Sequence, residues 1–117
     1  MRLEVYISDL LYRYPCVIIP GFGGFITEVS SAYFDEKLGV FYPPQKEIRF
    51  TSQLKTNDGI LANEISIQEN ISHEKANLKI EKHVLSWQNS LEIEKKLIIE
   101  KLGNFYKNNE NNLLFEP

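Results

Sequence analysis

The feature that most constrains this chain is an internal repeat at an offset of 80 residues. Residues 17–25 read VIIPGFGGF and align without a gap with residues 97–105, which read LIIEKLGNF. Branched apolar residues favour buried strands. A Gly-Gly or Gly-Asn pair before an aromatic residue favours a tight reversal with positive φ. We therefore expect a strand–turn–strand unit in each half, and the shared pattern indicates duplication.

An amphipathic helix is expected before each turn. Residues 3–14 carry apolar side chains at helical spacing, and Pro15 ends that helix. In the second half, Ser72 is the expected N-cap of a longer helix. The apolar stripe of this helix comprises Ala76, Ile80, Val84, Trp87 and Leu91. Between the two halves, residues 57–59 are expected to cap a shorter helix that covers Ile60, Leu61, Ile65 and, at its end, Ile67, and that breaks near Asn70.

The two halves diverge after their turns. In the second half, a strand at 105–107 returns through the polar segment 108–112 to 113–115, as a short hairpin. In the first half, the return strand is expected at 47–50, and the insertion at 29–46 predicts a β-arm extending from the body. We therefore expect a first lobe with its arm at 1–56 and a C-terminally truncated second lobe at 57–117. Because only the first half continues into a helix, we expect the chain to be the N-terminal region of a longer protein.

Composition bounds the location and the chemistry. The longest unbroken apolar run is four residues, 16–19, which is too short to cross a bilayer, and the N-terminus lacks the pattern of a signal peptide. The single cysteine, Cys16, cannot form an internal disulfide, which fits a reducing compartment such as the cytosol. The chain holds 13 basic and 16 acidic residues with alternating signs. This balance makes it a poor general DNA binder, because affinity for DNA comes largely from neutralised phosphates.

The sequence shows no catalytic, cofactor or metal pattern. A strand follows the glycine turn where a phosphate loop would open a helix. Cys16 begins an expected strand and has no base nearby in sequence, which predicts an inert core thiol. His73 and His83 stand ten residues apart on one expected helix, a spacing that does not predict a shared metal. We therefore predict a protein that is not an enzyme and that has no cofactor and no metal.

The order of elements resembles the HU/IHF superfamily, whose turn signature is similar to residues 20–25. The positions assigned to the structural turns are Gly21, Phe22, Gly23, Gly24, Phe25, Gly103 and Phe105. More narrowly, residues 18–25, 43–44, 57–63 and 114–117 are similar to tandem bacterial HU-like domains related to the HU domains of a eukaryotic centrosomal coiled-coil protein. The resemblance covers essentially the whole chain. It implies an α+β, HU/IHF-like fold in which two tandem lobes of helices and antiparallel β hairpins form an intramolecular pseudo-dimer.

The resemblance also implies a cellular setting. Members of this family typically carry the tandem region at the N-terminus, on the cytosolic side of the membrane. A transmembrane segment and a periplasmic SPOR domain, which binds peptidoglycan, follow it. The resemblance therefore implies the cytoplasmic part of a membrane-anchored protein of the cell envelope or of cell division.

The insertion at 29–46 departs from the HU pattern. HU and IHF bind the minor groove with paired basic arms that carry a proline wedge, whereas this insertion holds two basic and two acidic residues and has no counterpart in the second half. Exposed aromatic clusters favour protein partners. The candidate partner-binding residues are Tyr33, Phe34, Phe41, Tyr42, Pro43 and Pro44. The aromatic residues either contact a protein partner or pack against the body, and the two prolines form either a wedge or, as we prefer, the stiff base of the arm.

Two functions therefore stay open. The first is a non-enzymatic interaction module that binds a protein partner or self-associates. The alternative is a weak, sequence-independent DNA-binding domain of the HU type. The candidate nucleic-acid contacts for this alternative are Arg49, Lys55, Lys75, Lys79 and Lys82.

Overall fold

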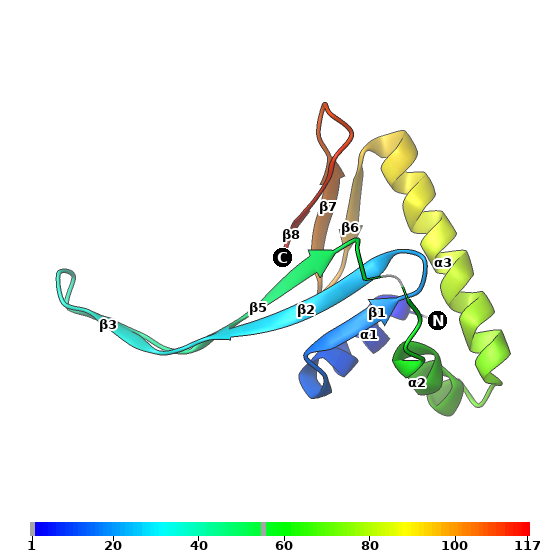
Figure 1. Cartoon of the computed structure of the whole chain (residues 1–117), viewed down its shortest axis with the longest axis horizontal. Helices are drawn as coiled ribbons and strands as arrows, with labels where there is room; N and C mark the ends of the chain where they lie inside the picture. Colours follow the sequence, from blue (N-terminus) through cyan, green and yellow to red (C-terminus); the bar gives the residue numbers. More distant parts are fainter. Residues whose placement is uncertain (1, 55) are drawn as a thin grey trace.

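The computed structural model of the chain describes residues 2–54 and 56–117 (Figure 1). The first half comprises α1 (Leu3–Arg13), β1 (Cys16–Ile19), β2 (Gly23–Ser30), β3 (Tyr33–Asp35), β4 (Val40–Tyr42) and β5 (Gln45–Thr51). The second half comprises α2 (Ile60–Glu69), α3 (His73–Glu94), β6 (Lys96–Ile99), β7 (Gly103–Lys107) and β8 (Leu113–Glu116). The predicted order of helices and strands is confirmed.

The pairing of strands repeats from one half to the other. Antiparallel sheets form in the orders β1-β2-β5 and β6-β7-β8, and β3 and β4 make a separate ribbon. Phe25 of β2 pairs with Val17 and with Phe50, as Phe105 of β7 pairs with Leu97 and with Phe115. The duplicated sequence segments therefore also pair in the same register in the two sheets.

The reversals lie earlier than the sequence suggested. The Phe22 amide donates to the Ile19 carbonyl at 3.0 Å, and the Leu102 amide donates to the Ile99 carbonyl at 3.2 Å. The third residue of each turn has positive φ, 79° at Gly21 and 71° at Lys101, as a type II turn requires. The prediction that the Gly23-Gly24 and Gly103-Asn104 pairs make the reversal is thus wrong, because those residues already belong to β2 and β7.

Gly23 and Gly103 instead permit the third strand of each sheet to approach closely. A Cβ atom on Gly23 would lie 2.6 Å from the carbonyl oxygen of Thr51 in β5, and one on Gly103 would overlap the carbonyl oxygen of Glu116 in β8. Each glycine also pairs with the last residue of the preceding strand, Ile19 or Ile99. The two glycines occupy matching settings, as the pseudo-symmetric interpretation requires.

Both halves contribute to one apolar core. The buried ring of Phe105 lies 4.8 Å from that of Phe50 and 6.0 Å from that of Phe25, between ring centroids. Phe22 of the first turn packs against Trp87 of α3 at 5.3 Å. Because rings from each half fill the space beside the other, the halves form an intramolecular pseudo-dimer around a common interior.

The helices begin where the sequence predicts. The Ser72 hydroxyl accepts a hydrogen bond from the Lys75 amide at 3.1 Å, which caps α3. Asn57 and Asp58 accept bonds from the amides that open α2, which ends before Asn70 at φ 55°. α2 extends over Ile67 as expected, although the side chain of Ile67 is 65% exposed. Across the described residues, no helix combines the length and the apolar character needed to span a membrane.

A polar network joins the helices of the two halves. Glu69 of α2 accepts from the Tyr6 hydroxyl at 2.8 Å and from the Lys79 ammonium at 2.7 Å. The hydrogen bonds from Lys79 and Tyr6 hold the pKa of Glu69 below its ordinary value. Burial and the same carboxylate raise the pKa of Tyr6. Arg13 of α1 also pairs with Glu64 of α2 at 3.0 Å.

Candidate functional site

The arm is a two-stranded extension that leaves the body at one end of the first sheet (Figure 1). β2 and β5 pair as far as Ser30 and Gln45, and the ladder resumes in the β3–β4 ribbon from Tyr33 and Tyr42. Pro43 and Pro44 lie in the break between these ladders. The two prolines interrupt the pairing because proline lacks an amide to donate to a ladder. They stand at the base of the β3–β4 ribbon, in keeping with the preferred interpretation of a stiff base.

The aromatic residues of the arm cover both of its faces. Tyr33 and Tyr42 lie directly opposite one another, with their rings stacked at 4.8 Å and 18°. Phe34 and Phe41 form the next cross-strand pair, which points to the other face because side chains alternate along a strand. Phe34 and Phe41 are 57% and 62% exposed. The alternative in which these aromatic residues pack against the body is wrong.

The tip of the arm is a tight turn held by its own carboxylate. Asp35 accepts hydrogen bonds from the amides of Lys37 and Leu38 at 2.9 and 3.1 Å, and Gly39 supplies a positive φ of 65°. The Asp35 carboxylate therefore stabilises the turn through these hydrogen bonds. Leu38 is 66% exposed at the tip.

Lys46 ties the root of the arm to the body. Its ammonium group donates to the Leu11 carbonyl at 3.0 Å and lies 5.3 Å from the centroid of the Tyr12 ring. A cation at the end of α1 interacts favourably with the helix dipole. One of the two basic residues of the insertion therefore belongs to the body, and the distal arm keeps Asp35, Glu36 and Lys37.

The candidate nucleic-acid residues are dispersed. Arg49 pairs with Glu28 at 3.0 Å and Lys79 pairs with Glu69 at 2.7 Å. Lys75 and Lys82 are exposed on α3. Lys55 lies outside the described residues. The structure thus gathers the candidate arm residues, whereas the candidate nucleic-acid contacts that it describes divide between β5 and α3. Two of them, Arg49 and Lys79, are already neutralised by carboxylates.

Comparison with known families decides the identity of the fold. Residues 1–58 match the family described as CCDC81-like prokaryotic HU domain 1, and residues 59–117 match CCDC81-like prokaryotic HU domain 2. The chain belongs to this family of tandem HU domains. No curated protein and no solved structure matches it. HU-like domains are typically non-enzymatic modules that bind nucleic acid or protein, and the predicted α+β, tandem HU-like fold is confirmed.

The outer faces of the two HU sheets are not basic. Since Phe25 points into the core, its neighbours Ile26 and Glu28 point outward, together with their partners Arg49 and Glu47. The same alternation turns six side chains of the second sheet outward: Lys96, Ile98, Asn104, Tyr106, Leu114 and Glu116. These faces together hold three carboxylates, two cations and several apolar side chains. Sequence reasoning missed this surface, although the alternation of Ile98 with buried Ile99 was a signal for it.

The reactive side chains of the HU lobes are engaged in local contacts. Burial and the charge of Asp58 raise the pKa of the Cys16 thiol, which disfavours the nucleophilic thiolate. His73 lies 3.0 Å from the Asn63 side-chain oxygen, and His83 lies 3.2 Å from the Lys79 carbonyl. Within residues 2–54 and 56–117, no cluster of three His, Cys, Asp or Glu side chains is placed to hold a metal.

Proposed function

We propose that this tandem HU chain is a non-enzymatic protein-interaction module whose arm is its main contact element. The observation that carries the proposal is the β3–β4 ribbon, which presents an aromatic pair on each face and extends away from the body (Figure 1). Aromatic side chains exposed in a cluster are enriched at protein interfaces. The acidic balance of the outer sheet faces also favours a protein over a phosphate backbone.

A shortened arm tests this proposal. Ser30 and Gln45 pair directly, and the Ser30 hydroxyl bonds to the backbone of Gln45. Residues 31–44 can therefore be replaced by Asn-Gly, the preferred two-residue hairpin turn. This replacement preserves the hydrogen bond from Lys46 to the Leu11 carbonyl, which removal of residues 29–46 would abolish. We expect the shortened protein to keep its melting temperature and to lose partner capture in affinity purification from the native cell.

Point variants separate the arm from the sheet. Phe34→Ser with Phe41→Ser should reduce partner capture as strongly as the shortened arm does. Ile98→Ser, at a side chain 70% exposed on the outer face of β6, is the matched control. Capture that survives both arm variants contradicts the role proposed for the arm.

Nucleic-acid binding is the second candidate function, and the disposition of α3 favours it. Lys75, Lys79 and Lys82 follow at steps of four and three residues, so they lie along one stripe of the helix. Because Lys79 is paired with Glu69, the two remaining contacts, Lys75 and Lys82, would give a slope of about −2 in a plot of log affinity against log salt concentration. Fluorescence anisotropy with a duplex, and with Lys75→Gln and Lys82→Gln, measures this slope. Anisotropy that stays at the free-duplex value even at low salt removes this candidate.

We further propose that the parent protein is membrane-anchored and acts in the cell envelope or in division, with this chain on the cytoplasmic face. The resemblance to tandem HU regions that precede a SPOR domain supports this setting. Membrane fractionation of the full-length protein tests it, together with protease access to the HU region in spheroplasts before and after lysis. An HU region digested in intact spheroplasts, or a full-length protein in the soluble fraction, rejects the proposal.

A further inference from the structure

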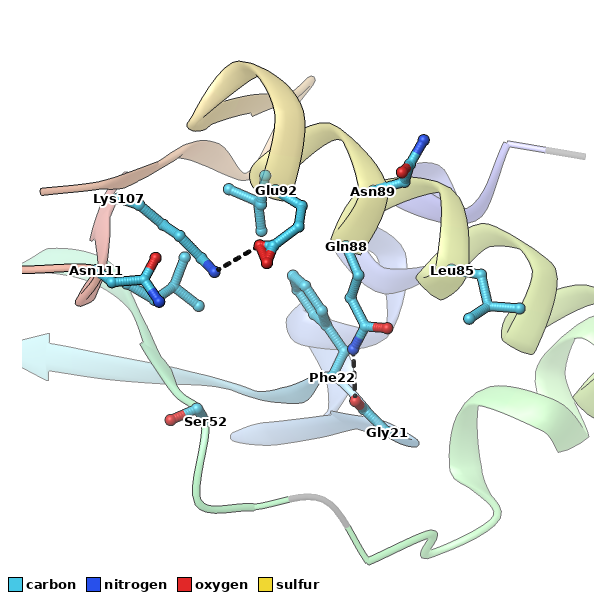
Figure 2. Close-up of a pocket in the computed structure, with 11 residues that line it drawn as sticks. Gly21, Phe22, Ser52, Leu85, Gln88, Asn89, Glu92, Lys107 and Asn111 are labelled. Atoms are coloured by element: carbon cyan, nitrogen blue, oxygen red, sulfur yellow. Dashed lines mark hydrogen bonds and ion pairs between the residues drawn. The ribbon is translucent and has the colours of Figure 1, made fainter.

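The outer face of α3 carries two exposed leucines, which we call the leucine stripe. Leu78 and Leu85 are 53% and 59% exposed and stand two helical turns apart, so they lie nearly on one line along the helix. The side chains that α3 buries lie on its opposite side: Ala76, Ile80, Val84 and Leu91. Figure 1 shows α3 along the border of the molecule away from the arm. In Figure 2, Leu85 stands apart from Gln88, which holds α3 on the Gly21 carbonyl at 3.1 Å. The leucine stripe is therefore an apolar line open to solvent.

Opposite charges flank the leucine stripe on its two sides. One side carries two lysines and the other carries two glutamates: Lys75 and Lys82, and Glu74 and Glu81. At about 100° per residue, each of these residues lies about 40 to 60° from the line of Leu78. All four are exposed, and none forms an ion pair with another residue of the ranges 2–54 and 56–117. The face thus has an apolar centre, a positive flank and a negative flank.

The two flanks decide how a second copy fits on this face. If two α3 helices pack by their leucine stripes about a two-fold axis parallel to the helices, the positive flank of each lies along the negative flank of the other. Lys75 then meets Glu74 of the second copy, and Lys82 meets Glu81, at nearly the same level along the axis. A two-fold axis perpendicular to the helices instead sets lysines against lysines and glutamates against glutamates, which is repulsive. The face is therefore complementary to itself in the parallel arrangement.

We propose that two copies of this chain associate in parallel through this face of α3. In heptad terms the leucines occupy d positions and the lysines a positions, and a lysine at position a selects the register of a coiled coil at a cost in stability. The contact runs over residues 74–85, about 18 Å of helix, and so covers less than the roughly 800 Å² per partner of a standard interface. The association is therefore weak, and its two-fold symmetry closes it at two copies.

The proposal does not depend on the proposed role of the arm. Each arm leaves its body on the side away from α3 (Figure 1), so the two arms of the pair extend in opposite directions. The glutamates of the face lie as close to the leucines as the lysines do, and they repel a phosphate backbone. A second copy, which offers both signs of charge, therefore fits this face better than a nucleic acid does.

Sedimentation equilibrium on the purified chain tests the proposal, from low micromolar to near-millimolar concentration. We expect the wild-type mass to rise from the 13.6 kDa of one chain towards twice that value and no further. Lys75→Glu with Lys82→Glu makes both flanks negative, and Glu74→Lys with Glu81→Lys makes both flanks positive. Each double variant alone should stay at the mass of one chain. An equimolar mixture of the two should regain the mass of two chains, because the negative flanks of one variant then face the positive flanks of the other.

A single cysteine reports the direction of the helices. In the parallel pair, Leu85 of each copy faces Leu85 of the other, whereas an antiparallel pair sets Leu85 against Leu78. In a Cys16→Ser background, Leu85→Cys should therefore form a disulfide-linked dimer in an oxidising glutathione buffer. Ile98→Cys, at a side chain 70% exposed on the outer face of β6, is the matched control and should not form this dimer.

Four results would overturn the inference. They are a wild-type chain that stays at the mass of one chain, charge-reversed variants that still associate, a mixture that does not regain the mass of two chains, and association that requires added duplex DNA. The last result would instead support the nucleic-acid candidate. None of them bears on the proposed function, which the capture of a different protein by the arm tests separately.

Discussion

Truncation of Phe105 should destabilise both halves of the molecule at once. Its side chain is fully buried, and its ring centroid lies 4.7 to 6.0 Å from the rings of Phe115, Phe50, Phe22 and Phe25. Replacement of a buried phenylalanine by alanine costs about 3 to 5 kcal/mol, through lost transfer free energy and the cavity left behind. Because three of these rings belong to the first half, we expect Phe105→Ala to lie near 4 kcal/mol, or about 15 °C in Tm for a chain of this length.

Urea denaturation followed by two probes measures this effect. Trp87 is the only tryptophan and packs against Phe22 at 5.3 Å, so its fluorescence reports the contact between the halves, whereas far-UV circular dichroism reports all helices. We expect coincident transitions for the wild type. Phe41→Ala makes the same truncation at an exposed position and should cost less than about 0.5 kcal/mol. A loss below about 1 kcal/mol for Phe105→Ala, or transitions that separate, would refute the idea of a shared core.

Three further variants probe the duplicated turns and the polar network. Gly103→Ala should lower the free energy of unfolding by about 2 to 3 kcal/mol, because the added Cβ atom meets the Glu116 carbonyl. Gly39→Ala, at the open tip of the arm, should lower it by about 1 kcal/mol, because only the positive φ opposes the substitution there. Lys101→Gly should raise stability by about 0.5 kcal/mol, since it relieves a φ of 71°, and an unchanged Tm would contradict that account of the second turn. Glu69→Gln should cost about 1 kcal/mol at neutral pH. Because the folded pKa of Glu69 is lowered, the stabilisation is present above the ordinary value of 4.5 and is lost as pH falls through the folded pKa. The wild-type and Glu69→Gln stability curves should therefore converge in acid, and a constant gap would count against the assignment.

The fold was readable from the sequence because its signals are local. Apolar spacing, the Ser72 cap and the repeated glycine motif each concern residues close together in the chain. The position of the reversals was not readable, because Gly21 and Gly23 stand two residues apart and both suit a turn. Only the approach of Thr51 across the sheet shows that Gly23 serves the neighbouring strand.

The candidate site was readable only in part. The aromatic content of the arm and its lack of net charge were visible, but its two-faced arrangement depends on the register that sets Tyr33 against Tyr42. The neutralisation of the candidate cations was invisible, since Arg49 meets Glu28 across a sheet and Lys79 meets Glu69 between helices. The spacing of such residues along the chain does not indicate that they pair in the folded structure. The cleft that α3 and the β7–β8 hairpin form with the turn at Gly21 and Phe22 likewise exists only once the two halves are folded together.

Because the two lobes belong to one polypeptide, they need not have the same sequence. Two identical subunits that meet about a symmetry axis must carry the same appendages, so a substitution in one is imposed on the other. Here the aromatic interior is completed within a single molecule at any dilution. Each lobe is therefore able to change alone, and the present chain holds an extended ribbon on one side and a bare hairpin on the other.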